Sequence, residues 1–268
     1  MIPPTSIDGT DITGATIDGT DVTEITVDGD VVFSAVTLPV AYSNLVAWYP
    51  FDSATYGGSN ADDVTAIIGG SGDDTAYDAS VFGATYISNG GLTDINKGAN
   101  SGAFDFDGSN DALQTDSKIA FGSHTKMCWI DANYNQTAIS SVTHIFGGKD
   151  SPKPEYTFIG IHNGTIRYVL DDGNISIDRI ITHSVSNGKH HAAITYDRSD
   201  GSCELFVDGT SVGTASKPSG LNFDAQQEFG ASFTEGVRFT DATIDDARIY
   251  DTVLSQSQIN QIYQNTQP

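Results

Sequence analysis

The chain of 268 residues carries 35 acidic and only 12 basic side chains, a formal net charge of −23 at pH 7. Nucleic-acid binding needs basic patches that meet phosphates, so this balance excludes nucleic acid as a partner and disfavours an anionic membrane surface. Neither a secretory leader nor a long apolar stretch is visible, and we expect no membrane insertion.

The acidic residues are spread along the chain instead of forming one tail, and lysine is scarce. This pattern is typical of a protein that stays soluble in concentrated salt, where screening removes self-repulsion and hydrated carboxylates keep the surface wet. It therefore predicts a halophilic source. A carbohydrate-binding protein rich in calcium is the competing explanation for so many Asp residues.

Residues 5–33 contain an internal repeat with a period of ten, which reads TSIDGTDIT, ATIDGTDVT and ITVDGDVVF. Each unit places Asp-Gly, the strongest short-range hairpin signal, between residues that favour strands. Units this short bury almost nothing, which favours stacking on each other or on neighbouring copies over a flexible linker. We predict residues 1–40 as an assembly or anchoring segment and residues 41–268 as one domain.

Period-two alternation predicts strands near the C-terminal end, at His191–Tyr196 and Cys203–Val207, with a hairpin turn at Asp208-Gly209. Residues 243–250 alternate again. The expected faces are Ile244, Asp246, Arg248 and Tyr250 on one side, and Asp245, Ala247 and Ile249 on the other. The two cysteines, Cys128 and Cys203, fall on predicted strands, where buried thiols are the default. A single disulfide bridge between them is also possible.

A short helix is predicted to close the chain. Ser255 fits an N-cap, Gln258 completes a capping box, and Leu254 is placed to pack on Ile259. The residues Ile259, Ile262 and Tyr263 then form a one-sided apolar stripe.

Six blocks of this sequence resemble, in order, the laminin-G-like, concanavalin A-like jelly-roll family. They are LVAWYPFD (45–52), AFDFDGSND (103–111), Trp129, IFGGKD (145–150), NGKHHAAITYDRSDGSCELFVDG (187–209) and TIDDARIYDTVLSQSQINQIY (243–263). The resemblance spans roughly residues 44–265, with one departure: Lys189 stands where the family has a tryptophan. It implies an all-β fold, a jelly-roll β-sandwich of two antiparallel sheets, here with a short C-terminal helix and an N-terminal β-repeat segment.

The resemblance also implies a structural Ca²⁺, which members of this family often hold. The matching positions are Asp78 and Asp245, and Asp52 is a third candidate. Calcium takes six to eight oxygen ligands from carboxylates and carbonyls on adaptable loops. The sequence leaves open the alternative that these carboxylates are merely solvated, as expected among so many acids.

Laminarinase-type enzymes of the same fold need two Glu flanking an Asp on one strand, at the spacing that glycosidic cleavage requires. This chain has five Glu residues, and no two stand close enough to form that group. The pair Glu204 and Asp208 is weakened because Asp208 belongs to a hairpin turn. We therefore expect no enzymatic activity.

Sugar recognition uses exposed aromatic rings beside amides and carboxylates, because pyranose faces are apolar and their rims carry hydroxyls. Two long loops are expected, at residues 53–102 and 133–143. The first contains Tyr56 and Tyr86, which fit such a platform and fit loop anchors equally well.

The sequence thus predicts a non-enzymatic surface recognition module. The Asp-Gly repeats resemble segments near the starts of virion tail and fibre proteins, so we predict a fibre, spike or capsid-surface protein on the virion surface. It would bind host glycans or surface-layer glycoprotein in high salt, and residues 1–40 would contact copies of the chain and other virion proteins, giving an oligomer. The alternatives are a carbohydrate-binding or adhesin module of a secreted cell-surface protein, located outside the cell, or a purely structural decoration.

Overall fold

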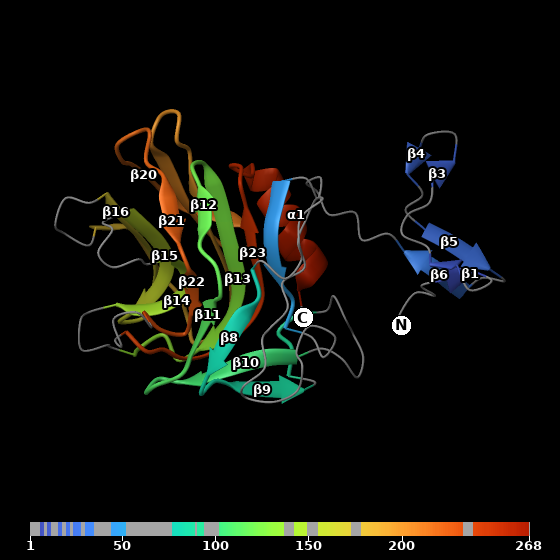
Figure 1. Cartoon of the computed structure of the whole chain (residues 1–268), viewed down its shortest axis with the longest axis horizontal. Helices are drawn as coiled ribbons and strands as arrows, with labels where there is room; N and C mark the ends of the chain where they lie inside the picture. Colours follow the sequence, from blue (N-terminus) through green and yellow to red (C-terminus); the bar gives the residue numbers. More distant parts are fainter. Residues whose placement is uncertain are drawn as a thin grey trace.

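The computed structural model describes residues 44–51, 77–88, 90–93, 102–136, 142–148, 155–172, 178–232 and 238–267, with short strands among the first 34 residues. Two large antiparallel sheets form a sandwich, and helix α1 (Gln256–Thr266) lies beside β23 on the outer side of one of them (Figure 1). The predicted jelly-roll sandwich with a C-terminal helix is confirmed. No helix among these residues is long and apolar enough to cross a bilayer.

The eight-stranded sheet runs β20 (Thr210–Ser216), β19 (Ser202–Val207), β18 (Gly188–Tyr196), β13 (His124–Ala132), β23 (Asp241–Tyr250), β10 (Gly102–Asp107) and β9 (Thr85–Ser88). One edge of β23 pairs with β13 along its length. The other edge pairs with β10 at residues 241–244 and with β7 (Leu45–Tyr49) at residues 247–250. Strand β23 therefore fixes the positions of three neighbours.

The seven-stranded sheet runs β17 (Asp178–Ser184), β16 (Thr165–Asp172), β15 (Glu155–His162), β14 (Thr143–Gly148), β22 (Gln227–Phe229), β11 (Ala112–Thr115) and β8 (Ala79–Phe82). A small ribbon pairs β12 (Ile119–Phe121) with β21 (Phe223–Ala225). The expectation of one long loop from residue 53 to residue 102 was wrong, because β8 and β9 are edge strands within it. Both are only four residues long, too short to give a clear alternation signal.

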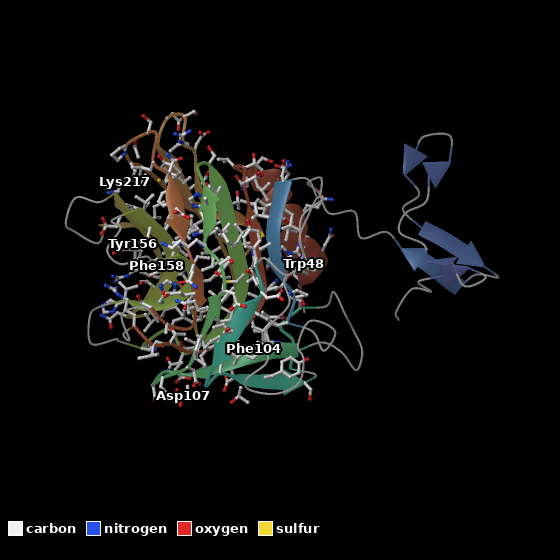
Figure 2. The ribbon with its side chains drawn as sticks, viewed as in Figure 1. Trp48, Phe104, Asp107, Tyr156, Phe158 and Lys217 are labelled. Atoms are coloured by element: carbon white, nitrogen blue, oxygen red, sulfur yellow. The ribbon has the colours of Figure 1, made fainter. Side chains whose placement is uncertain are left out.

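Aromatic rings fill the space between the sheets, where the sticks of Figure 2 are dense. Phe146 stacks on Phe229 with ring centroids 4.6 Å apart, and Tyr49 meets Phe229 edge-on at 5.2 Å. Phe104 packs edge-on against Phe51 at 5.2 Å. These contacts join strands of both sheets and bury large apolar areas, the main favourable contribution to folding. The two cysteines are buried and free, so there is no bridge between them.

The predicted faces of β23 need one correction. Ile244 lies in the interior with Ala247 and Ile249, not on the face of Arg248. The strand bulges between residues 245 and 248, where its pairing with β13 shifts and Asp246 adopts a φ of 48°. A bulge inserts one extra residue and so reverses the faces that strict alternation assigns beyond it.

Helix α1 begins as predicted. Ser255 accepts a hydrogen bond from the Gln258 backbone, and the Gln258 side chain accepts from the Ser255 N–H. Leu254, Ile259 and Ile262 are buried in a second apolar cluster on the outer face of the eight-stranded sheet. At the far end the Trp129 indole donates to Thr266 Oγ1 over 2.8 Å, so the helix is attached at both ends.

The first 34 residues contain three two-stranded ribbons, the short blue arrows of Figure 1. They pair β1 (Ser6–Ile7) with β2 (Thr10–Asp11), β3 (Thr16–Ile17) with β4 (Thr20–Asp21), and β5 (Glu24–Val27) with β6 (Asp30–Ser34). Each pair brackets one Asp-Gly, as the repeat predicts. The division at residue 40 stays a prediction.

Three histidines are completely buried, and burial lowers the pKa of each to about 3. They are His124, His144 and His191. Neither ring nitrogen of His191 has a hydrogen-bond partner among the described residues, and its ring packs against both Trp129 and Tyr263. An unfolded histidine has a pKa near 6.5, so below that pH the unfolded chain binds protons that the folded chain does not.

We predict that acid weakens the fold, and that His191→Phe reduces the effect. Each buried histidine lowers the free energy of unfolding by roughly 1.4 kcal/mol per pH unit below pH 6.5. Burial raises the pKa of Asp245 to about 8, so the folded chain holds one proton there that the unfolded chain lacks, and this offsets the effect of one histidine. The free energy of unfolding, measured with denaturant, should be about 2 kcal/mol lower at pH 5 than at pH 6. The variant should also be more stable at pH 7, because a phenyl ring leaves no buried nitrogen unpaired. An equal pH dependence in both proteins would contradict this.

Candidate functional site

A hollow of about 480 Å³ lies between the turn that joins β19 to β20 and the first turns of α1. Its volume is within the usual range of small-ligand sites, about 300–1,000 Å³. The residues that line it are Gly209, Thr210, Gln256, Ser257 and Asn260. Every side chain in this set is an uncharged amide or hydroxyl, and all four of these side chains are exposed.

The hairpin wall of the hollow is held by an ion pair. Asp208 Oδ2 lies 2.8 Å from His190 Nδ1, and Asp208 Oδ1 accepts the His191 backbone N–H over 3.0 Å. The hydrogen bond to Asp208 raises the pKa of His190. Burial alone would raise the pKa of Asp208, but the hydrogen bonds from His190 and His191 outweigh it and leave that pKa lowered. The Asp208 carboxylate is therefore ionised at neutral pH.

The turn needs Asp-Gly for a geometric reason. Asp208 and Gly209 have φ values of 49° and 71°, the left-handed pair of the commonest two-residue hairpin turn. Gly209 also presses against the helix: a Cβ there would lie 2.6 Å from Asn260 Oδ1 and 2.9 Å from Tyr263 Cδ1. Tyr263 in turn stacks on Trp129 at 5.6 Å. Gly209 on the hairpin and the Tyr263–Trp129 stack under the helix thus set the distance between the hairpin and α1.

The hollow offers hydrogen bonds in both directions. Amides donate and accept at once, and hydroxyls do the same with free rotation. Vicinal hydroxyls of a sugar present the matching pattern. None of the lining residues is acidic or basic, and the nearby carboxylates have partners: Glu204 accepts from Ser211 Oγ, and Asp208 pairs with His190.

The predicted metal residue Asp245 lies deep in the structure, 1% exposed. Its Oδ2 accepts the Leu92 N–H over 2.8 Å and its Oδ1 accepts the Asp246 N–H over 2.7 Å. Burial and the neighbouring Asp246 raise its pKa to about 8. Asp245 thus anchors the backbone at Leu92 to the bulge of β23.

Asp78 precedes β8 in the other sheet and is half-buried, and Asp52 lies outside the described residues. Among the residues that the structure describes, no three Asp, Glu, His or Cys side chains are grouped to hold a metal ion. These residues alone therefore do not form a complete calcium site.

Tyr86 lies on edge strand β9 and is half-buried. Its ring packs on Phe104 at 5.6 Å and sits so close over Gly102 that a Cβ there would meet the Tyr86 hydroxyl at 2.2 Å. In this position Tyr86 anchors the edge of the sheet. A sugar-binding role for it stays a prediction, and Tyr56 lies outside the described residues.

Sequence reasoning missed the hollow, although two signals for it were present. One is the Asp208-Gly209 turn. The other is the helix, where residues 252–268 contain no charged side chain although 18% of the chain is charged. What the sequence does not give is the packing of one against the other, which Gly209, Asn260 and Tyr263 make.

Residues 107–260 match the model of the family Laminin_G_3, described as the concanavalin A-like lectin/glucanases superfamily. The fold is similar to the binding domain of botulinum neurotoxin serotype D, at 17% identity and a TM-score of 0.55, covering 84% of this chain and 51% of that one. The serotype D ligand binding domain in complex with N-acetylneuraminic acid is similar at 14% identity and a TM-score of 0.55, with 84% of this chain and 51% of that one covered.

The binding domain of neurotoxin DC in complex with rat synaptotagmin II is also similar, at 14% identity and a TM-score of 0.57, with 84% of this chain and 52% of that one covered. The chain spans about half the length of these domains. Identities this low show a shared fold alone. No curated protein matches the chain in sequence.

We predict that Gly209→Ala destabilises the protein by about 1 kcal/mol more than Gly220→Ala. Both glycines have left-handed φ values, so both substitutions carry the same backbone cost of roughly 1–2 kcal/mol. A Cβ at Gly220 meets nothing within 4 Å, whereas one at Gly209 strikes the helix. Denaturant unfolding of the two variants measures the difference, and equal losses would show that the hairpin does not press on α1.

Proposed function

We propose that this chain, which belongs to the concanavalin A-like lectin/glucanases superfamily, is a non-enzymatic module that binds carbohydrate in the hollow between the β19–β20 turn and α1. One observation carries the proposal: four uncharged amide and hydroxyl side chains converge on a hollow of ligand size whose walls are fixed in place. Such groups satisfy sugar hydroxyls by paired hydrogen bonds and have no acid–base chemistry of their own.

The comparisons support the same class of function. One structural neighbour is in complex with N-acetylneuraminic acid and another with rat synaptotagmin II, so domains that contain this fold bind a sugar and a protein in those cases. The described carboxylates also give no support to hydrolysis, which needs two of them placed on either side of the scissile bond.

We further propose the setting that the sequence suggests: the surface of a virion from a halophilic host, where the module contacts host glycans or surface-layer glycoprotein. The net charge of −23 and the three Asp-Gly ribbons support it. The alternatives are an adhesin or carbohydrate-binding module of a secreted protein, and a decoration that binds no ligand. A substitution in the hollow that abolishes ligand binding and leaves assembly intact would favour the two binding roles over the decoration.

A structural Ca²⁺ remains part of the proposal, with Asp245, Asp78 and Asp52 as its candidate carboxylates. Both carboxylate oxygens of Asp245 accept hydrogen bonds from backbone N–H groups, so loop carbonyls would have to supply most of the calcium ligands. Bound calcium would favour the ionised form of Asp245 and hold the segment near Leu92 to β23.

We predict that the full chain binds a glycan array printed with oligosaccharides, and that Asn260→Ala removes most of this binding. Loss of one buried hydrogen-bonding pair typically costs about tenfold in affinity. Asn265→Ala, on the opposite side of the same helix, is the matched control and should bind like the parent protein.

Repeating the assay and a thermal melt with calcium and with EDTA tests the metal: identical melting temperatures would remove calcium from the proposal.

We also predict that residues 1–40 assemble the chain. Size-exclusion chromatography with light scattering in molar NaCl should give a discrete oligomer for the full chain and a monomer for residues 41–268. Isolated two-stranded ribbons are marginal in water, so their stability should come from contact between copies. A full chain that runs as a monomer would make this segment a linker and favour the secreted-module alternative.

A further inference from the structure

The C-terminal segment that forms one wall of the hollow differs from the rest of this acidic protein because it carries no charged side chain. Seventeen consecutive residues, 252–268, contain no Asp, Glu, Lys, Arg or His, and seven of them are amides. The amides are Gln256, Gln258, Asn260, Gln261, Gln264, Asn265 and Gln267. All but Gln258 and Gln267 are exposed. Helix α1 thus presents an amide surface on a chain of net charge −23.

Stability of the helix does not require this composition. Acidic residues in the first turn of a helix are favourable because they face the positive end of its dipole, yet the first turn of α1 has none. Its N-cap is already satisfied by Ser255 and Gln258. In a protein with 35 acidic residues, Gln256 and Ser257 occupy the positions where Asp or Glu would stabilise α1 most. The absence of charge at the hollow therefore points to the ligand.

We propose that the hollow selects uncharged glycans and rejects those that carry sialic or uronic acids. This deepens the proposed carbohydrate-binding function and rests on it. The residues assigned to this selectivity are Gln256 and Asn260, one on each turn of helix that faces the Gly209 hairpin.

Two electrostatic effects disfavour an acidic ligand in the hollow. A carboxylate on the ligand is held most strongly by a cation, and no lining residue is basic. The hollow instead lies on a chain of net charge −23, whose field disfavours the approach of a further carboxylate, while the charge of Asp208 in the adjoining turn is paired with His190. A neutral sugar meets neither cost. Its hydroxyls pair with the amides, and these short-range contacts persist in concentrated salt, where long-range attraction is screened.

The experiment uses the full chain and its variants on an array of matched oligosaccharides, lactose beside 3′-sialyllactose and trigalactose beside trigalacturonic acid. The parent protein should bind a neutral member at least about tenfold better than its acidic partner. Asn260→Asp should lose that neutral binding by a similar factor, because the carboxylate no longer donates. Asn265→Asp adds the same charge to the far side of the helix and should leave binding unchanged.

Gln256→Lys adds a gain-of-function arm, since it places a cation in the hollow and should shift preference toward the acidic member of a pair. Melting temperatures close to that of the parent establish that each variant is folded. Binding to acidic members as tight as to neutral ones, or an equal loss in Asn265→Asp, would overturn the selectivity while leaving carbohydrate binding in place. Silence of the parent protein on all four oligosaccharides would overturn the proposed function itself.

Discussion

A buried ion pair on β23 sets the register on which the rest of the sandwich depends. Arg248 contacts both oxygens of Asp246, at 3.0 Å each, and the Trp48 indole donates to the same carboxylate over 2.5 Å. The guanidinium also lies 4.8 Å from the Trp48 ring centroid. Because a buried pair costs desolvation, its net contribution to stability is small, but breaking it leaves an unpaired charge and costs several kcal/mol. Its value here is geometric: it holds the bulge where β23 changes partner from β10 to β7.

The candidate site depends on that register through two intervening strands. The bulge fixes β13 against β23, and β13 places Trp129 under the helix, where it contacts both Tyr263 and Thr266. Strand β18 follows β13 in register and brings His190 to the hairpin, where it binds Asp208. The two walls of the hollow are therefore positioned by separate chains of contact that begin at one strand. A shift of β23 by one residue would move both walls and reverse its buried face.

Much of this architecture follows from the sequence, and the failures have identifiable causes. The alternating strands, the Asp-Gly turns and the capping box at Ser255 depend on neighbours in the chain, so local rules find them. Ile244 was assigned to the wrong face because a bulge is fixed by contacts with Arg248 and Trp48, far apart in sequence from one another. Of the candidate residues, Asp245 is a buried anchor and Tyr86 a half-buried one, since residue type shows chemistry but not whether a side chain faces solvent. The hollow lies between segments about fifty residues apart, and only packing brings them together.

On the proposed function, the acidic surface and the uncharged helix have different roles. Thirty-five carboxylates keep the chain hydrated and repel polyanions, which suppresses wrong partners without any specific contact. Recognition then needs a region that is polar enough to stay wet and neutral enough for a ligand to approach. An amide-rich helix meets both conditions, because amides hydrogen-bond strongly to hydroxyls and carry no field beyond a few ångströms. The acidic surface and the uncharged helix are on this argument two parts of one device: the first sets what is kept away, and the second sets what is held.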